Sequence, residues 1–264
     1  MGKLPPVAVA GSGDIARYLA EEFVRDGQHD FHIISRTERP WFSELGIQYH
    51  LVPSYSKENL VELFGKFEIS TVVSTLTADD APTFVSLHQA ILDACRQSST
   101  CKRLIPSDFI GNVESFPDLP RRHADSRHAF RKILGQQSEV EVTWTSARDL
   151  SKAVVQLVKH PKWDQYTYVY GETGTWLEAI PKVEKLLNLK IERIPVSREE
   201  IEKTVQDGSD PDKQYIASID EWAVAGAGLV PMDVAEKQRA KFFGDVKFRT
   251  IEELIQEAQV SDVV

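Results

Sequence analysis

Short apolar runs alternate with amphipathic stretches along the first 145 residues of the chain. The runs are about four to six residues long, as expected for strands buried inside a sheet. Six strands are predicted in this way: Val7–Ala10, Phe31–Ser35, Ile47–Val52, Thr71–Thr75, Arg103–Pro106 and Val140–Thr145. Strands that alternate with helices are typical of βαβ units, so the pattern predicts an α/β fold built on a parallel sheet.

The stretches between the apolar runs have the spacing of helices. In Asp14–Arg25 the apolar side chains recur every three or four residues and share one face. Pro82–Gln97 begins with a proline, which suits the first turn of a helix. Cys95 lies on the apolar face of this second helix, so we expect it to pack as a small buried side chain, whereas Cys101 is expected in a polar loop.

The pattern changes after residue 145. Four segments there begin with Ser or Thr followed three residues later by an acid, which is the signature of a capping box. The four pairs are Ser146/Asp149, Thr175/Glu178, Ser197/Glu200 and Thr250/Glu253. The C-terminal part is therefore expected to be a smaller α+β segment, which places a domain boundary between residues 145 and 146.

Composition restricts the classes of function. The 264 residues carry a formal net charge of −9, which disfavours binding to nucleic-acid phosphates or to an anionic membrane. No run approaches the roughly 20 apolar residues of a membrane helix, so we expect a cytoplasmic protein with no membrane partner. Two cysteines are too few for a disulfide framework, and the seven histidines lack the spacing of metal ligands, so no metal is expected.

The strongest chemical signal is a glycine motif that joins the first strand to the first helix. Gly11, Gly13 and Ala16 match G-x-G-x-x-G/A. The first glycine permits a tight turn, the second lets a pyrophosphate approach the backbone, and the small third residue lets helix and strand pack closely. The motif predicts a Rossmann-type, doubly wound sheet that binds a dinucleotide, with residues 1–145 as the cofactor domain and 146–264 as the substrate or cap region.

Arginine follows the second strand, where NAD-binding proteins carry an acid for the ribose hydroxyls. Arg36 directly follows the run FHIIS, and Arg39 is three residues further on. A guanidinium pairs well with phosphate, so Arg36 favours NADP(H). The alternative is that Arg36 is a solvated loop residue and Glu38 takes the ribose.

Together with VVSTLT after strand four and RLIPSDFIGN after strand five, these motifs resemble the NmrA-like and isoflavone-reductase-like family of atypical short-chain dehydrogenases. Near the C-terminus, TWLEAIPKVEKLLN and AKFFGDVKFRTIEELI are similar to the fungal branch of that family. The resemblance implies that three sets of residues contact NADP(H). The sets are Gly11, Ser12, Gly13, Asp14 and Ile15 at the pyrophosphate with Arg36 at the 2′-phosphate, Thr75 and Leu76 along the cofactor, and Pro106, Ser107, Asp108 and Phe109 near the nicotinamide.

The catalytic position departs from the family. No tyrosine is followed by lysine four residues later, so the usual Tyr-x-x-x-Lys pair is absent from the sequence. Isoflavone-reductase-like enzymes use a lysine after strand five, and alignment by apolar residues puts Arg127 there. Arg127 stays protonated, so it could bind an anionic or carbonyl-bearing substrate or stabilise developing oxyanion charge. The alternative is a structural salt bridge. His123 and Asp108 are the candidate proton donors. The alternatives are a surface or helix-start position for His123 and a helix cap for Asp108. On the helix expected here, Lys132 lies opposite the apolar stripe and is expected to be a solvated charge; the stripe is Ala129, Phe130, Ile133 and Leu134.

A second departure concerns length. Family members carry a further segment where Trp144, Thr145 and Ser146 are contiguous in this chain, which implies a more open substrate pocket. Three functions stay open. One is an NADPH-dependent reductase of a small carbonyl, imine or aromatic compound. The second is a non-redox cyclase or isomerase on the same fold. The third is an NADP-binding, redox-sensing regulator without turnover that acts on a protein partner.

Overall fold

A computed structural model describes residues 3–78, 80–109, 111–112, 114–116, 119, 142–192 and 196–258. The chain divides into two compact units, each made of two segments that alternate along the sequence. The sheet unit consists of Met1–Phe109 and Ser151–Trp163, and the second unit of Ile110–Leu150 and Asp164–Val264. The division into cofactor and substrate regions at residues 145 and 146 stays a prediction, because it concerns ligands rather than compactness.

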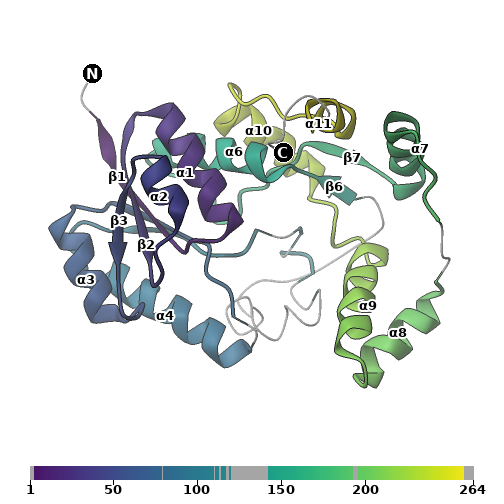
Figure 1. The fold of residues 1–264 in the computed structure, drawn as a ribbon, viewed down its shortest axis with the longest axis horizontal. Helices are drawn as coiled ribbons and strands as arrows, with labels where there is room; N and C mark the ends of the chain where they lie inside the picture. Colours follow the sequence, from purple (N-terminus) through teal and green to yellow (C-terminus); the bar gives the residue numbers. More distant parts are fainter. Residues whose placement is uncertain are drawn as a thin grey trace. The chain divides into compact units, whose positions relative to one another are not determined.

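The sheet unit is built on a five-stranded parallel sheet (Figure 1). Its strands are β1 (Leu4–Ala10), β2 (His29–Ser35), β3 (Gln48–Leu51), β4 (Thr71–Ser74) and β5 (Arg103–Ile105). Their order is β3-β2-β1-β4-β5, so the chain leaves β1 in one direction to β3 and then crosses back to β4 on the other side. This order confirms the predicted Rossmann-type α/β fold and puts the topological switch point between β1 and β4.

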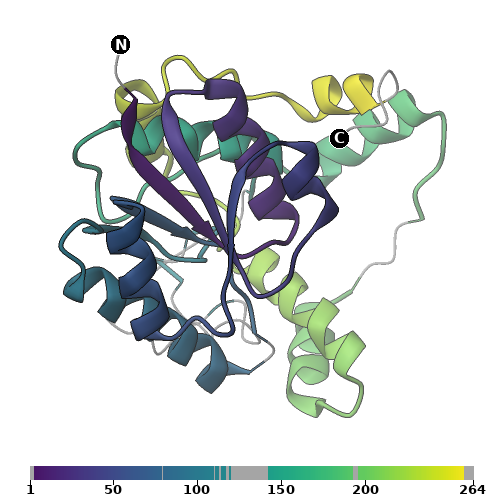
Figure 2. The same cartoon turned by 60° about the vertical axis from the view of Figure 1, so that its left-hand side comes forward.

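Helices cover both faces of the sheet (Figure 2). They are α1 (Asp14–Asp26), α2 (Pro40–Glu44), α3 (Lys57–Lys66), α4 (Ala81–Gln97) and the Ser151–Lys159 part of α6 (Ala147–Lys159). On one face α1 packs against β2, where the rings of Phe23 and Phe31 stack at 4.7 Å. On the other face α3 and α4 contact each other. Side chains of successive strand residues point to opposite faces of a sheet. The second half of β1, most of β2 and all of β4 are buried, as expected for strands covered on both faces, whereas β3 and β5 at the two sides are partly exposed.

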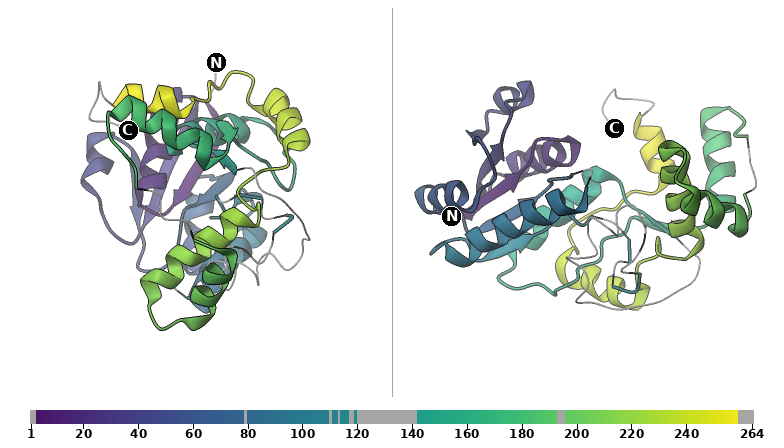
Figure 3. Two further views of the ribbon diagram at one scale, coloured as in Figure 1. Left: turned by 90° about the vertical axis from the view of Figure 1, so that its right-hand side faces the viewer. Right: turned by 90° about the horizontal axis from the view of Figure 1, so that it is seen from below.

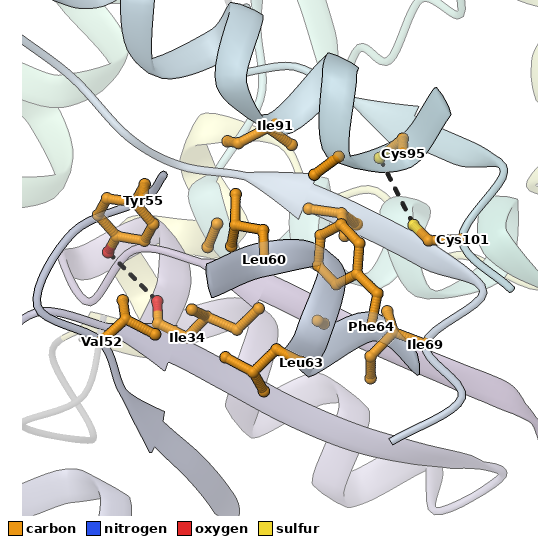
Figure 4. Close-up of a cluster of buried hydrophobic side chains, with 14 of the residues drawn as sticks. Ile34, Val52, Tyr55, Leu60, Leu63, Phe64, Ile69, Ile91, Cys95 and Cys101 are labelled. Carbon is orange, nitrogen blue, oxygen red and sulfur yellow. Dashed lines mark hydrogen bonds between the residues drawn. The ribbon is translucent and has the colours of Figure 1, made fainter. Parts of the chain in front are cut away.

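A large apolar cluster fills the space between the sheet and the α3–α4 pair (Figure 4). Ile34 from β2, Leu60 and Phe64 from α3 and Ile91 from α4 are buried in it. Cys95 packs there as predicted, but the prediction of a polar environment for Cys101 is wrong, since its side chain is fully buried with Sγ 3.5 Å from Cys95 Sγ. The loop turns inward because Ser98 Oγ accepts the N–H groups of Thr100 and Cys101.

The last predicted strand does not join the parallel sheet. It forms β6 (Val142–Trp144), which pairs antiparallel with β7 (Glu172–Gly174) in a separate two-stranded sheet of the second unit. The prediction is wrong on this point because an apolar run specifies a strand but not its partner. Glu172–Gly174 has no apolar residue, so the sequence pattern carried no sign of β7.

The other elements that the structure describes in the second unit are helices (Figure 3). Its helices are α7 (Trp176–Leu187), α8 (Arg198–Asp207), α9 (Pro211–Val224), α10 (Met232–Phe242) and α11 (Ile251–Ala258). Figure 3 shows α8 and α9 side by side, and α7 contacts α11. In the part of the chain that the structure describes, none of the helices combines the length and the apolar composition needed to span a membrane.

Three of the four predicted capping boxes close. Reciprocal hydrogen bonds join Thr175 to Glu178, Ser197 to Glu200 and Thr250 to Glu253. At the fourth, Ser146 Oγ accepts the N–H of Asp149 at 3.0 Å, but the buried Asp149 carboxylate accepts hydrogen bonds from the backbone N–H and guanidinium of Arg249. A buried carboxylate needs such a partner, so Asp149 ties α6 to the segment before α11.

Candidate functional site

The turn after β1 has a backbone that only glycine suits. Gly11 has a φ of +125°, and its N–H donates to the carbonyl of Ile34 at 2.9 Å. A Cβ placed on Gly11 would lie 2.2 Å from Thr75 Oγ1, which follows β4. Gly11 therefore lets the turn pass against the end of β4 at the topological switch point.

The N-terminus of α1 is open to solvent. Gly13 is the N-cap residue and is exposed to solvent. No side chain of the described residues caps the helix. A Cβ on Gly13 would meet no described atom within 4 Å apart from its chain neighbours, whereas Ala16 is fully buried against the sheet. Free N–H groups and the helix dipole favour an anion at such an end, so this turn fits a pyrophosphate.

The two residues that follow Gly13 differ in exposure. Asp14 is exposed in the first turn of α1, where an acid is favourable to the helix dipole, and Ile15 is half-buried. Ser12 lies on the other side of the turn, with its Oγ 3.0 Å from Ser35 Oγ at the end of β2. The glycine turn is thereby tied to β2 by a side-chain contact as well as by the Gly11 backbone.

An aromatic platform lies beneath Arg36. The guanidinium of the exposed Arg36 is 5.8 Å from the ring centroid of Tyr55. Tyr55 is buried and donates a hydrogen bond to the Ile34 carbonyl at 3.3 Å (Figure 4), and burial raises the pKa of its hydroxyl. A cation over an aromatic ring is held without losing its hydrogen-bond donors, so Arg36 remains able to bind a phosphate. Sequence patterns missed Tyr55 because it stands in a loop without periodicity.

Two other charged residues between β2 and α2 have different neighbours from Arg36. Arg39 Nε lies 3.5 Å from Ser12 Oγ, which brings a second guanidinium to the glycine turn. Glu38 instead accepts a hydrogen bond of 2.6 Å from the hydroxyl of Tyr49 on β3, and this bond raises the pKa of Tyr49. The carboxylate that would serve a ribose in the NAD alternative is thus engaged with β3.

Segments after β4 and β5 reach the same edge of the sheet. The N–H and hydroxyl of Thr75 donate to the Ala10 carbonyl at 2.9 and 3.1 Å, and Leu76 is buried. After β5, Ser107 is buried, Pro106, Asp108 and Phe109 are half-buried, and the Asp108 N–H donates to the Pro106 carbonyl at 2.9 Å. The cofactor contacts that the resemblance implies therefore lie at the carboxyl ends of the parallel strands. We call this the carboxyl edge, and open α/β sheets bind ligands there.

A histidine that the sequence analysis did not select lies behind these two segments. His88 of α4 is fully buried, and its Nε2 is 3.0 Å from Ser74 Oγ and 3.4 Å from the Ser107 nitrogen. In the sequence it is one polar residue within an apolar helix face, a pattern typical of a core position. Only the fold brings it to the carboxyl edge.

The catalytic candidates that follow β5 in the sequence, Asp108 excepted, lie outside the described residues. This applies to His123, Arg127 and Lys132, so their roles stay predictions, and Asp108 is the catalytic candidate that the structure places at the edge. Across the described residues, no group of three or more His, Cys, Asp or Glu side chains could hold a metal ion.

Comparison with known proteins identifies fungal relatives. No protein-family model matches the chain. An oxidoreductase named swnR from Arthroderma benhamiae is 27% identical over 297 residues, covering 94% of this chain and 95% of that protein. The swnR oxidoreductase of Metarhizium robertsii is 25% identical, covering 93% and 94%. The first alignment is longer than this chain, so that relative has residues without a counterpart here.

Solved structures show the same fold. A nucleoside-diphosphate-sugar epimerase from Staphylococcus aureus matches with a TM-score of 0.72 at 14% identity, covering 95% of this chain and 99% of that chain. A leucoanthocyanidin reductase from Vitis vinifera, solved with NADPH, matches with a TM-score of 0.70 at 16% identity and covers 97% and 100%. Pinoresinol-lariciresinol and phenylcoumaran benzylic ether reductases, described as related to isoflavone reductases, give a TM-score of 0.72 at 14% identity, covering 96% and 98%. These structures share the fold that the resemblance implied, and the fungal oxidoreductases are similar to this chain over nearly its whole length.

Proposed function

We propose that this protein is an NADP(H)-dependent oxidoreductase that reduces a small carbonyl, imine or aromatic metabolite. The observation that carries the proposal is the uncapped, exposed N-terminus of α1 behind Gly11 and Gly13, with Arg36 beside it on the Tyr55 platform. The names of the fungal relatives and the NADPH bound to a protein of the same fold support it.

Each part of the edge has a separate task in binding. Gly11, Ser12, Gly13, Asp14 and Ile15 would hold the pyrophosphate through backbone N–H groups, and Arg36 would bind the 2′-phosphate. Thr75 and Leu76 would lie along the cofactor, with Pro106, Ser107 and Phe109 near the nicotinamide. When bound, NADPH would supply the hydride, and the protein would mainly orient it.

Reduction of a carbonyl also needs a group that stabilises negative charge on oxygen and a source of a proton. We assign the first task to Arg127, whose guanidinium can stabilise an oxyanion without giving up its proton. His123 and Asp108 are the candidate proton donors, since both can change protonation state.

Arg127→Ala tests this assignment once a substrate is known. We expect turnover to fall by about 100-fold, the usual effect of losing one oxyanion-stabilising donor, while the dissociation constant of NADPH stays the same. Steady-state kinetics and calorimetry provide the two measurements. Unchanged turnover would remove Arg127 from the site.

The proposed cofactor is tested by calorimetric titration of the purified protein with NADPH, NADP, NADH and NAD in parallel, after any bound nucleotide has been removed. We expect binding selective for the two phosphorylated nucleotides. A substrate screen that follows NADPH absorbance then tests reduction. Failure to bind any of the four would show that the glycine turn has only a structural role.

A regulator without turnover is the second candidate. It is favoured by Arg127 at the position where the family has lysine, and by segments of the fungal relative that this chain lacks. A regulator would bind NADP(H) selectively but would not consume NADPH with any compound, and the bound nucleotide would change its affinity for a partner protein. A non-redox cyclase or isomerase would convert its substrate at constant NADPH concentration.

A further inference from the structure

The ring of His88 lies at the centre of a buried hydrogen-bond network behind β4 and β5. Nδ1 is 3.0 Å from the carbonyl oxygen of Phe84, one helical turn earlier in α4. Nε2 is 3.0 Å from Ser74 Oγ at the end of β4 and 3.4 Å from the backbone nitrogen of Ser107 after β5. His88 and Ser74 are both fully buried. One side chain thus joins a helix to two strand ends.

The partners decide which ring nitrogen carries the proton. The Phe84 carbonyl can only accept, so Nδ1 must be the donor. The Ser107 N–H can only donate, so Nε2 must be the acceptor, and the Ser74 hydroxyl then also donates to it. The ring is therefore the neutral Nδ1–H tautomer, and its single Nε2 lone pair is shared by two donors.

This acceptor determines the position of backbone on both sides of the edge. Ser107 is held directly. Leu76 is held through Ser74, because the Leu76 N–H donates to Ser74 Oγ at 3.4 Å. Buried donors that lose their acceptor carry a desolvation penalty, so removal of Nε2 would favour movement of both segments toward water.

We propose that His88 is a positioning residue that fixes the segments after β4 and β5 for the nicotinamide half of NADP(H). The inference rests on the proposed function, since that function places Leu76 along the cofactor and Ser107 near the nicotinamide. The adenosine half belongs to other residues, namely Gly13 at the start of α1 and Arg36 after β2. Loss of the His88 acceptor is therefore expected to weaken one half of the cofactor site and to leave the other intact.

Two substitutions separate the acceptor from the donor. In His88→Gln the side-chain amide oxygen can take the place of Nε2 and accept from Ser74 and Ser107. In His88→Asn the shorter amide can replace the Nδ1–H donor to Phe84 but does not reach the Nε2 position. Both variants lose the ring that stacks on Phe84 at 4.1 Å, so they are matched for lost packing.

The test compares NADPH with adenosine 2′,5′-bisphosphate, which has the 2′-phosphate and adenosine of NADPH but no nicotinamide. Dissociation constants are measured by calorimetry for the full chain and both variants. For His88→Asn we expect NADPH binding to weaken by about tenfold or more, as for one buried hydrogen bond, with adenosine 2′,5′-bisphosphate binding unchanged. For His88→Gln we expect both constants to stay within about threefold of the unsubstituted protein.

Equal weakening of both ligands by His88→Asn, or no weakening of either, would overturn the inference. If His88→Asn does not fold, Ser74→Ala replaces it, because this change removes the hydroxyl that connects Leu76 to His88 and leaves the ring in place. It too should weaken NADPH alone. If the unsubstituted protein binds neither ligand, the proposed function is wrong. If it binds both and the variants show no NADPH-specific loss, only the role of His88 is wrong.

Discussion

Buried histidines have different surroundings in two regions of the same sheet, the carboxyl ends of its strands and its outer side at β2 and β3. At the carboxyl edge between β1, β4 and β5, the His88 ring has a hydrogen-bond partner at both nitrogens. At the outer edge, on β2 and β3, His32 Nδ1 lies 2.9 Å from His50 Nε2. His32 Nε2 is buried and has no hydrogen-bond partner among the described residues, with the Asp30 carboxylate 3.8 Å away.

The difference lies in what each edge holds fixed. The hydrogen bonds of His88 hold the backbone after β4 and after β5, so they arrange the segments where a ligand would lie. The outer pair is instead kept neutral by its surroundings. Burial lowers the pKa of His32, and burial together with His32 and Lys66 lowers the pKa of His50 to about 4. We therefore expect the carboxyl edge to govern binding and the outer histidines to govern stability toward acid.

The largest expected effect is that of Gly11→Ala at the carboxyl edge. The new Cβ would meet Thr75 Oγ1, and alanine is strained at a φ of +125°. We expect the free energy of unfolding to fall by about 2–4 kcal/mol, measured by urea denaturation. Gly13→Ala is the matched control. Its Cβ faces open space, so stability should be unchanged while NADPH binding weakens, and a stability loss equal to that of Gly11→Ala would contradict this account of the turn.

The next largest effect is expected for substitution of Arg36, the exposed residue that follows β2, and it concerns the affinity for NADPH. Arg36→Ala removes the proposed 2′-phosphate ligand, so we expect NADPH affinity to fall by about 10- to 100-fold and NADH affinity to change little. Glu38→Gln serves as the control, because its carboxylate is engaged with Tyr49. Parallel titrations with both nucleotides measure the selectivity. Equal losses for NADPH and NADH in Arg36→Ala, or a selective loss of NADH in Glu38→Gln, would support the ribose role of Glu38 instead.

The smallest effect concerns acid stability at the outer edge. The pKa of His50 is lower in the folded protein than in the unfolded chain, so the unfolded chain binds more protons between pH 6.5 and about 4. Stability from this group is therefore complete above pH 6.5 and is lost as the pH falls toward 4. Because the ring is half-exposed, solvent screening reduces the expected loss to about 1 kcal/mol.

His50→Gln removes this titration. Urea denaturation at pH 7 and pH 4.5 should show a smaller acid loss for His50→Gln than for the unsubstituted protein. His160→Gln, which changes the histidine directly after α6, is the matched control. If His50→Gln loses as much stability in acid as the unsubstituted protein, the outer pair is not the acid-sensitive element.

Much of the sheet unit could be predicted because its signals are local. Buried parallel strands appear as apolar runs, and the glycine motif fixed both the turn at Gly11 and the start of α1. The pattern was less informative where a residue's role depends on a distant partner. The polar sequence around Cys101 did not indicate that its side chain is buried against Cys95. The last apolar run likewise gave no sign that its partner would be β7.

The sequence by itself determined the fold class, the glycine turn and the arginine after the second strand, because each depends on residues that are neighbours in the chain. Only the tertiary structure placed Tyr55 under Arg36, engaged Glu38 with Tyr49, and brought Ser74, His88 and Ser107 together. These contacts join residues from different strands, helices and loops. Their geometry is set by the order β3-β2-β1-β4-β5 and by the packing of α4 on the sheet, which no local pattern encodes.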